Sequence, residues 1–112
     1  MGVEYSCGSL VWIKFPGYPW WPGMVDYCPE LEETFLLDEE SPSNEAAKYH
    51  VVFFDKPTNV ARSWMEKELV AKMTDPEQPP KPPVFKSDAI KKRYQHAKSM
   101  LLDAFSLPTI ER

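Results

Sequence analysis

Residues 15–23 read Phe15-Pro16-Gly17-Tyr18-Pro19-Trp20-Trp21-Pro22-Gly23, a stretch in which two adjacent indoles stand between prolines. Tryptophan binds a cation through its ring face better than any other side chain. The prolines restrict the backbone around the rings, and the glycine favours a bend between two extended segments. The stretch therefore predicts an arch that presents aromatic rings, which is typical of a binding module.

Composition places the chain among single globular domains. It has 112 residues, of which 43% are hydrophobic and 13% aromatic, and its 12 prolines predict a loop-rich fold. No apolar run approaches the roughly 18 residues of a membrane span, and no signal peptide opens the chain, so we expect a soluble intracellular protein. Cys7 and Cys28 form no CxxC pair and have no histidine pair nearby, so we expect reduced thiols and no metal site.

Charge is distributed unevenly along the chain. Residues 1–80 carry 6 basic and 14 acidic side chains, a net −8, whereas residues 81–112 carry 7 basic and 3 acidic ones, a net +4. The chain as a whole, at −4, is not a general binder of nucleic acid. Any contact with DNA has to come from a local basic patch, one that includes the C-terminal part.

Short strand-like segments fill residues 1–73. Residues 9–15, 21–27, 48–54 and 60–65 are rich in β-branched and aromatic side chains. Residues 55–59 are a turn cluster that joins the last two segments as a hairpin, and residues 66–73 fit a short helical turn or a last short strand. This pattern predicts a mainly β fold, a small five-stranded antiparallel barrel.

Residues 29–47 interrupt this pattern with seven acidic side chains and no basic one. The apolar patch 35–37 is expected to anchor this segment, which is longer than a hairpin needs. We interpret it as an inserted, solvated acidic loop. The alternative is an electrostatic fence that repels DNA or meets a basic partner.

The C-terminal third predicts a connector and a helix. Residues 74–86 contain five prolines and predict an extended, semi-rigid spacer, for which a proline-rich ligand segment is the alternative. In residues 87–106, Ser87 or Asp88 is expected to cap a helix that runs to about Phe105. Its apolar stripe, expected to pack on the barrel, is Ile90, Tyr94, Ala97, Leu101 and Ala104.

Four segments together resemble the PWWP domain. They are 8–14, 17–25 with the unsubstituted Pro19-Trp20-Trp21-Pro22, 52–55 (Val-Phe-Phe-Asp), and 64–70 with Trp64 and Leu69-Val70. The long insert, together with the pattern Tyr-His-Val-Val-Phe-Phe at 49–54 and Arg-Ser-Trp at 62–64, most resembles the PWWP domains of CW-type zinc-finger proteins. The resemblance implies a five-stranded barrel related to Tudor and chromo domains, followed by one or more helices. It also implies a nuclear, monomeric domain of a larger protein that binds a methylated histone H3 tail, most often trimethylated at lysine 36, and nucleosomal DNA weakly.

The resemblance implies a cage for methyl-lysine made by Tyr18, Trp21 and Phe53, with Phe15 at its border and Trp20 outside it. A trimethylammonium group keeps its charge but has no N–H to donate, so ring faces suit it better than hydrogen-bonding side chains. Strand alternation puts residues 53 and 54 on opposite faces, so one of the two is expected in the core. Trp12, Phe54 and Trp64 are expected to be core residues.

Polar side chains after the 48–54 segment are candidates for the rim of the cage. Thr58 or Asn59 would bond the backbone of a bound peptide, and Asp55 would favour a lower methylation state by accepting an N–H. Basic side chains near the cage or on the helix are candidates for contacts with DNA phosphates, which carry no base specificity. They are Lys14, Lys56, Lys91, Lys92, Arg93 and Lys98.

A second interpretation stays open, in which the domain binds DNA and its aromatic pocket is structural or inactive. An enzyme is a poor interpretation, because His50 and His96 have no paired nucleophile or carboxylate motif and no glycine-rich phosphate loop exists. We therefore expect no catalytic residue and no cofactor. A WW-type domain is also unsuitable, because its two tryptophans are well separated rather than adjacent.

Overall fold

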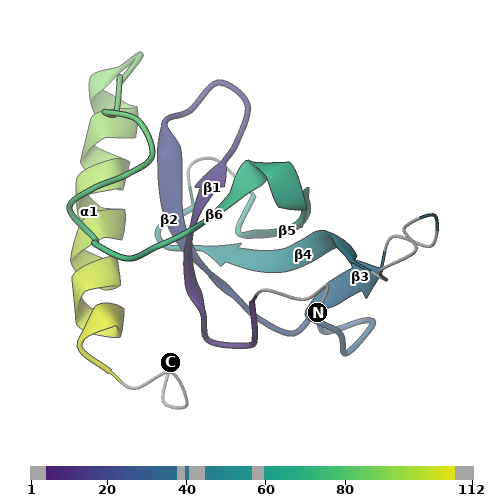
Figure 1. Ribbon diagram of the computed structural model, residues 1–112. Coiled ribbons are helices and arrows are strands. Elements are labelled where there is room, and N and C mark those ends of the chain that lie inside the picture. Colours follow the sequence, from purple (N-terminus) through teal and green to yellow (C-terminus); the bar gives the residue numbers. More distant parts are fainter. Residues whose placement is uncertain (1–4, 38–39, 41–44, 57–59, 108–112) are drawn as a thin grey trace.

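A computed structural model describes residues 5–37, 40, 45–56 and 60–107 (Figure 1). Within these residues the chain forms six strands, one short 3-10 turn and one α-helix. In chain order they are β1 (Leu10–Lys14), β2 (Trp20–Val25), β3 (Phe35–Leu37), β4 (Ala46–Phe53), β5 (Arg62–Glu66), η1 (Lys67–Leu69), β6 (Val70–Lys72) and α1 (Asp88–Phe105).

The strands form one curled antiparallel half-barrel, followed by the C-terminal helix. The sheet order is β3-β4-β2-β1-β6, and β5 pairs with β4. Figure 1 shows α1 standing beside β2, against which it packs. This arrangement confirms the predicted fold class of a small antiparallel β-barrel followed by a helix.

The core lies around β1, which runs between β2 and β6. Its residues Val11, Trp12 and Ile13 are fully buried, because both faces of this central strand are covered. The predicted core position of Trp12 is thereby confirmed. Trp64 is only half-buried: it lies on β5 with its ring centroid 5.3 Å from that of His50, so its predicted place in the core is wrong.

Strand β2 can lie close to its neighbours because Gly23 has no side chain. A Cβ at this position would stand 2.6 Å from the carbonyl oxygen of Val52 on β4, closer than real Cβ contacts come. The register pairs Gly23 with Phe53 and with Val11. The glycine thus lets the arch-bearing strand sit tightly between β1 and β4.

The acidic segment 29–47 is not simply a loop. Its apolar patch forms β3, which pairs with β4 so that Phe35 lies opposite Tyr49. The sequence analysis expected this patch to anchor the segment but did not predict a strand, because three residues are too few for a periodic signal. Leu36 and Leu37 remain exposed at this edge of the sheet.

Helix α1 begins as predicted at a serine cap. The Ser87 hydroxyl accepts a hydrogen bond from the Ile90 N–H at 3.2 Å. Of the predicted apolar stripe, Tyr94, Ala97 and Leu101 are buried, and the remaining two members pack against the core while partly exposed. Among the described residues, no helix is long and apolar enough to span a membrane.

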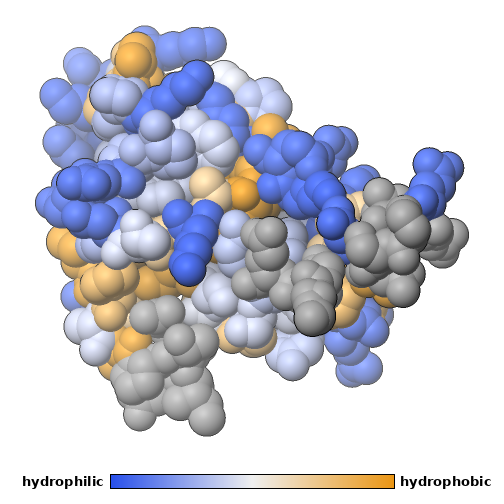
Figure 2. Space-filling view, in the orientation of Figure 1, coloured by the Kyte–Doolittle hydropathy of each residue, from blue (hydrophilic) through white to orange (hydrophobic). Residues whose placement is uncertain are grey.

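One face of the molecule carries apolar side chains over the C-terminal half of α1. Figure 2 shows this region as an orange area below the hydrophilic end of the helix. The exposed large apolar residues in this part of the chain are Met100, Leu102, Phe105 and Leu107. They lie outside the buried stripe, which shows that the helix buries one face only.

Candidate functional site

Four aromatic rings meet where the arch crosses the end of β4; we call them the ring cluster. It consists of Phe15, Tyr18, Trp21 and Phe53. The ring centroids of Phe15 and Phe53 are 5.6 Å apart at 76°, and those of Phe15 and Tyr18 are 5.6 Å apart at 45°. Tyr18 and Trp21 are 6.3 Å apart at 89°. All four residues that the sequence assigned to a cage and its border therefore lie together.

The arch is the turn 15–19 that joins β1 to β2, and its backbone geometry brings the rings of Phe15 and Tyr18 into the cluster. Gly17 has a φ of +85°, a conformation that glycine adopts without strain. The Tyr18 N–H donates to the Phe15 carbonyl at 3.0 Å, which closes the turn. The Lys14 ammonium donates to the Tyr18 carbonyl and ties the arch to the end of β1.

Trp21 is the most constrained ring of the cluster, with 0% of its surface exposed. Its indole N–H donates to the Phe54 carbonyl at 2.7 Å. Its ring lies 5.5 Å from that of Tyr94 on α1, at 85°. Trp21 therefore joins the arch to both the end of β4 and the helix, a contact with α1 that the sequence analysis did not foresee.

Both phenylalanines at the end of β4 are buried, Phe53 at 4% and Phe54 at 9% exposure. The expectation that opposite faces leave only one of them in the core is wrong. Strand β4 ends at Phe53, and the next N–H donates to the Pro22 carbonyl at 3.1 Å. Asp55 then takes a positive φ of 40°, so the two-residue alternation stops where the chain turns.

Access to the ring cluster is through its two half-buried members, Phe15 and Tyr18. The faces of Trp21 and Phe53 are closed off in the described conformation. A ligand that uses these faces has to displace Phe15 or Tyr18 first. The geometry is thus a closed aromatic cluster beside a bent, glycine-containing arch.

The turn after β4 is held by the helix. The carboxylate of Asp55 lies 2.9 Å from Nδ1 of His96, and the Arg93 guanidinium donates to the Lys56 carbonyl at 3.0 Å. Asp55, a candidate for the rim, is therefore already engaged by α1. The other two rim candidates, Thr58 and Asn59, lie outside the described residues.

The candidate DNA contacts fall into two groups in the structure. Three of them already make internal contacts: Lys14 with the Tyr18 carbonyl, Arg93 with the Lys56 carbonyl, and Lys98 with Glu77. The other three have exposed side chains, Lys56 beside the helix and Lys91 and Lys92 on it. The exposed basic groups thus lie on the helix side of the ring cluster.

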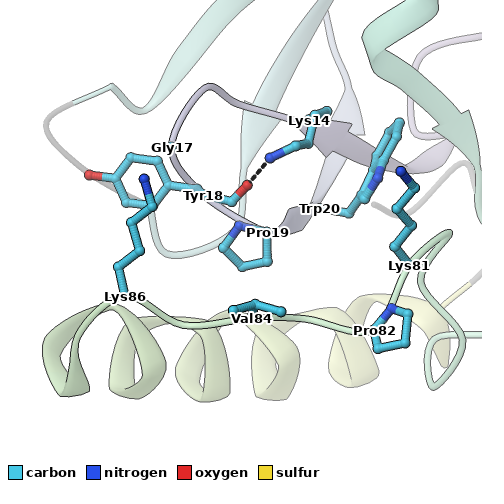
Figure 3. A pocket seen from close by; sticks show the side chains of 9 residues that line it. All are labelled: Lys14, Gly17, Tyr18, Pro19, Trp20, Lys81, Pro82, Val84 and Lys86. Carbon is cyan, nitrogen blue, oxygen red and sulfur yellow. Dashed lines mark hydrogen bonds between the residues drawn. The ribbon is translucent and has the colours of Figure 1, made fainter.

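A hollow lies beside Tyr18, between the arch and residues 81–86; we call it the lysine groove. Its volume is about 520 Å³. It is lined by Lys14, Gly17, Tyr18, Pro19, Trp20, Lys81, Pro82, Val84 and Lys86 (Figure 3). The sequence does not predict this hollow, because the prolines of residues 74–86 are typical of a spacer. The alternation of β2, which turns the side chain of Trp20 away from that of Trp21, was the available signal.

The titratable groups show little unusual chemistry. Within the described residues no cluster of three or more His, Cys, Asp or Glu side chains is placed to hold a metal ion, and both cysteines are free thiols. Burial raises the pKa of the Tyr94 hydroxyl, and Glu77 adds to the shift. Burial and the nearby Asp26 carboxylate raise the pKa of the Cys7 thiol.

Comparison with known proteins gives consistent results. The family model described as PWWP domain matches residues 8–102. Zinc finger CW-type PWWP domain protein 1 from Homo sapiens is 46% identical over 63 residues, which are 56% of this chain and 9% of that protein. Histone-lysine N-methyltransferase NSD3 from Mus musculus is 36% identical over 77 residues, 69% of this chain and 5% of that protein. The chain thus spans less than a tenth of these two relatives.

Among solved structures, a PWWP domain from Schizosaccharomyces pombe is 29% identical to this chain. The match covers 96% of this chain and 97% of that one, with a TM-score of 0.49.

Proposed function

Since the chain belongs to the PWWP domain family, a family of chromatin-associated binding modules, we propose that it reads a methylated histone lysine through the ring cluster. The preferred target is the histone H3 tail trimethylated at lysine 36, and the domain acts in the nucleus. The observation that carries the proposal is that Phe15, Tyr18, Trp21 and Phe53 lie within one chain of ring contacts.

The ring angles support a site for a methylated ammonium group. Tyr18 and Trp21 stand at 89°, and Phe15 and Phe53 at 76°, so their faces point in different directions. Each face is worth about 0.5–1 kcal/mol to a cation when exposed and about 2 kcal/mol or more when dry. The faces of Tyr18, Trp21 and Phe53 together therefore supply several kcal/mol of binding free energy, from which the entropy cost of ordering a peptide is subtracted.

Opening of the ring cluster reduces this gain. Because Trp21 and Phe53 are buried, binding has to move Phe15 or Tyr18, and contacts between these rings are lost. An aromatic pair contributes about 0.5–1.5 kcal/mol beyond its buried area. We therefore expect weak binding to an isolated peptide, with Phe15 as the side chain that moves.

Contacts with nucleosomal DNA add to this weak affinity. Lys56, Lys91 and Lys92 are exposed, Lys56 in the turn that follows Phe53 and the other two on the helix whose Arg93 holds this turn. A second contact on the same nucleosome raises the effective concentration of the histone tail at the ring cluster. Since phosphate contacts weaken steeply with salt, nucleosome binding should fall with ionic strength much more than peptide binding.

The second candidate function is a DNA-binding module with a structural ring cluster. The complete burial of Trp21, its hydrogen bond to Phe54 and its contact with Tyr94 favour this alternative. Under it, methylation of the histone tail has no effect on affinity, while the exposed lysines carry the binding.

A titration with histone H3 peptides that carry zero to three methyl groups at lysine 36 separates the two functions. The informative variant is Tyr18→Ala, because Tyr18 is half-buried, and Tyr18→Phe is its matched control since it keeps the ring. A reader binds more tightly with each methyl group, loses this dependence in Tyr18→Ala, and keeps it in Tyr18→Phe. Equal affinity for all four peptides, with DNA binding intact, contradicts the reader and supports the second function.

A further inference from the structure

Apart from Tyr18, which belongs to both, the residues of the lysine groove have no part in the function proposed above. We propose that it binds a short acidic peptide in an extended conformation, with one apolar side chain seated between two carboxylates. The occupant is a segment of a partner protein. The proposal rests on the shape of the groove, its apolar walls and the placement of its lysines.

The walls of the groove are apolar and come from two segments far apart in sequence. Pro19 and Trp20 face it from the arch, and Pro82 and Val84 face it from the connector (Figure 3). Val84 is 78% exposed, so its side chain is available to a ligand. An apolar side chain that enters here covers the valine and part of the half-buried Trp20.

Positive charge surrounds this apolar surface. Lys81 and Lys86 extend from the connector toward the arch, Lys81 on the side of Trp20 and Lys86 on the side of Tyr18 (Figure 3). Lys14 lies at the end of β1, and its ammonium donates to the Tyr18 carbonyl of the arch. No acidic side chain is among the lining residues. In a chain of net charge −4, this local excess of three positive groups favours an anionic occupant.

The spacing of the lysines suits an extended peptide. Five residue steps separate Lys81 from Lys86. A fully extended proline-rich segment rises about 3.1 Å per residue, which sets an upper limit of about 15 Å on the separation of the two Cα atoms. In an extended peptide, side chains i, i+2 and i+4 share a face, and the outer two are about 13 Å apart. A pattern of acid, any residue, apolar, any residue, acid therefore matches the lysine, valine, lysine arrangement.

A peptide fits these features better than duplex DNA does. The phosphates of DNA bind basic side chains, but the phosphate backbone has no projecting apolar side chain to pack on the wall formed by Pro82 and Val84. The histone tail segment of the function proposed above carries positive charge, which the three lysines repel. An acidic peptide with an apolar centre uses both kinds of lining residue.

The test is a titration of the whole domain, followed by NMR, with peptides of one length. The matching probe is Glu-Ser-Leu-Ser-Glu. Control probes are Glu-Ser-Ser-Ser-Glu, which lacks the apolar group, Glu-Glu-Leu-Ser-Ser, which has the wrong spacing, and Lys-Ser-Leu-Ser-Lys, which has the wrong charge. We expect a Kd of about 1 mM for the matching probe, with shifts at the Trp20 indole and at residues 81–86, and weaker binding of all three controls.

Two variants locate the binding. Lys81→Glu/Lys86→Glu should weaken it at least about fivefold, since each exposed ion pair contributes modestly and both become repulsive. The matched control is Lys48→Glu/Lys72→Glu, which changes the net charge equally at exposed positions on β4 and β6 and should leave the Kd unchanged. Val84→Ser removes the apolar contact at an exposed site and should also weaken binding, with the amide spectrum of the fold retained.

Two outcomes overturn the proposal. One is equal binding of the leucine and serine probes, which means that the groove takes any anion. The other is that a short DNA duplex shifts the same residues more strongly than the matching probe and loses affinity in the charge-reversal variant, which assigns the groove to phosphates. Neither outcome bears on the methyl-lysine reader, because that function is tested with positively charged peptides and Tyr18→Ala.

Discussion

The two faces of the arch differ although neighbouring tryptophans build them. On one face, Trp21 is fully buried, bonds the Phe54 carbonyl and contacts Tyr94 of α1, within a closed ring cluster. On the other face, the half-buried Trp20 lines an open groove with three lysines. Tyr18 belongs to both. Adjacent residues of one strand thus serve different surfaces, because side chains alternate across a strand.

This difference teaches that aromatic content alone does not locate a binding surface. The ring cluster has more aromatic side chains but little exposed ring surface, and it has to open before it binds. The lysine groove has fewer rings but is already hollow. We therefore expect the closed face to contribute more to the stability of the domain than the open face does, and the open face to bind without rearrangement.

The largest expected effect is the loss of stability on replacement of Trp21. Trp21→Ala removes a fully buried ring and leaves the Phe54 carbonyl without its donor, so the free energy of unfolding should fall by about 3–5 kcal/mol. Trp20→Ala should cost less than half as much, because its side chain is half-exposed. Urea unfolding followed by circular dichroism measures both, and equal losses would contradict the division between the faces.

A smaller effect is expected from Gly23→Ala on the strand that carries both tryptophans. The added Cβ would stand 2.6 Å from the Val52 carbonyl oxygen, so β2 and β4 have to separate. Overpacking of this kind costs about 1–3 kcal/mol. Gly17→Ala is the matched comparison: nothing lies within 4 Å of its Cβ, and the cost, about 1 kcal/mol, comes from its φ of +85°. A larger loss for Gly17→Ala would contradict this ranking.

The sequence predicted much of the fold for identifiable reasons. The strand segments were recognisable because β-branched and aromatic residues cluster in them, and the helix because its apolar stripe recurs at helical spacing after Ser87. The short β3 was not predictable from three residues whose strand conformation depends on pairing with β4. The alternation argument failed at Phe54, because the strand ended one residue earlier than the local pattern suggested.

The candidate site was predictable in membership but not in conformation. Tyr18, Trp21, Phe53 and Phe15 were identified through the family resemblance, and the structure brings their rings together. That Trp21 is fully buried depends on Tyr94, a helix residue more than seventy positions away, which no local pattern links to the arch. The lysine groove depends in the same way on where the connector lies against the arch.

A still smaller loss of stability is expected from a substitution in the connector, and this substitution should affect binding at one face of the arch only. Phe85 is half-buried with its ring 5.2 Å from that of Tyr94, and it anchors the segment that carries Lys81, Val84 and Lys86. Phe85→Ala should reduce stability by about 1–2 kcal/mol, because the aromatic pair and part of the buried ring surface are both lost. It should also weaken binding of the acidic peptide severalfold, since the groove wall loses its anchor. Methyl-lysine binding should stay unchanged, and an equal loss on both faces would show that they are coupled.

The smallest effect is expected at Cys7, which contributes to neither face. Its thiol donates to the Asp26 carboxylate at 3.4 Å, and burial together with this carboxylate raises the pKa of the thiol. Because the thiolate is the form that reacts, the thiolate fraction at pH 8 is lower than in a free cysteine. Iodoacetamide should therefore modify Cys7 in the folded domain more slowly than it modifies the thiol of glutathione. Mass spectrometry measures both rates.

Alkylation of Cys7 also serves as a control for the comparison of the two faces. The residue precedes β1 and approaches Asp26 just beyond the end of β2, at the opposite end of these strands from the arch. A modified domain should therefore bind the methylated histone peptide and the acidic peptide as the unmodified one does. If modification weakened the binding of only one of the two ligands, this end of the sheet would be coupled to one face of the arch and not to the other. The two faces would then differ in coupling as well as in exposure.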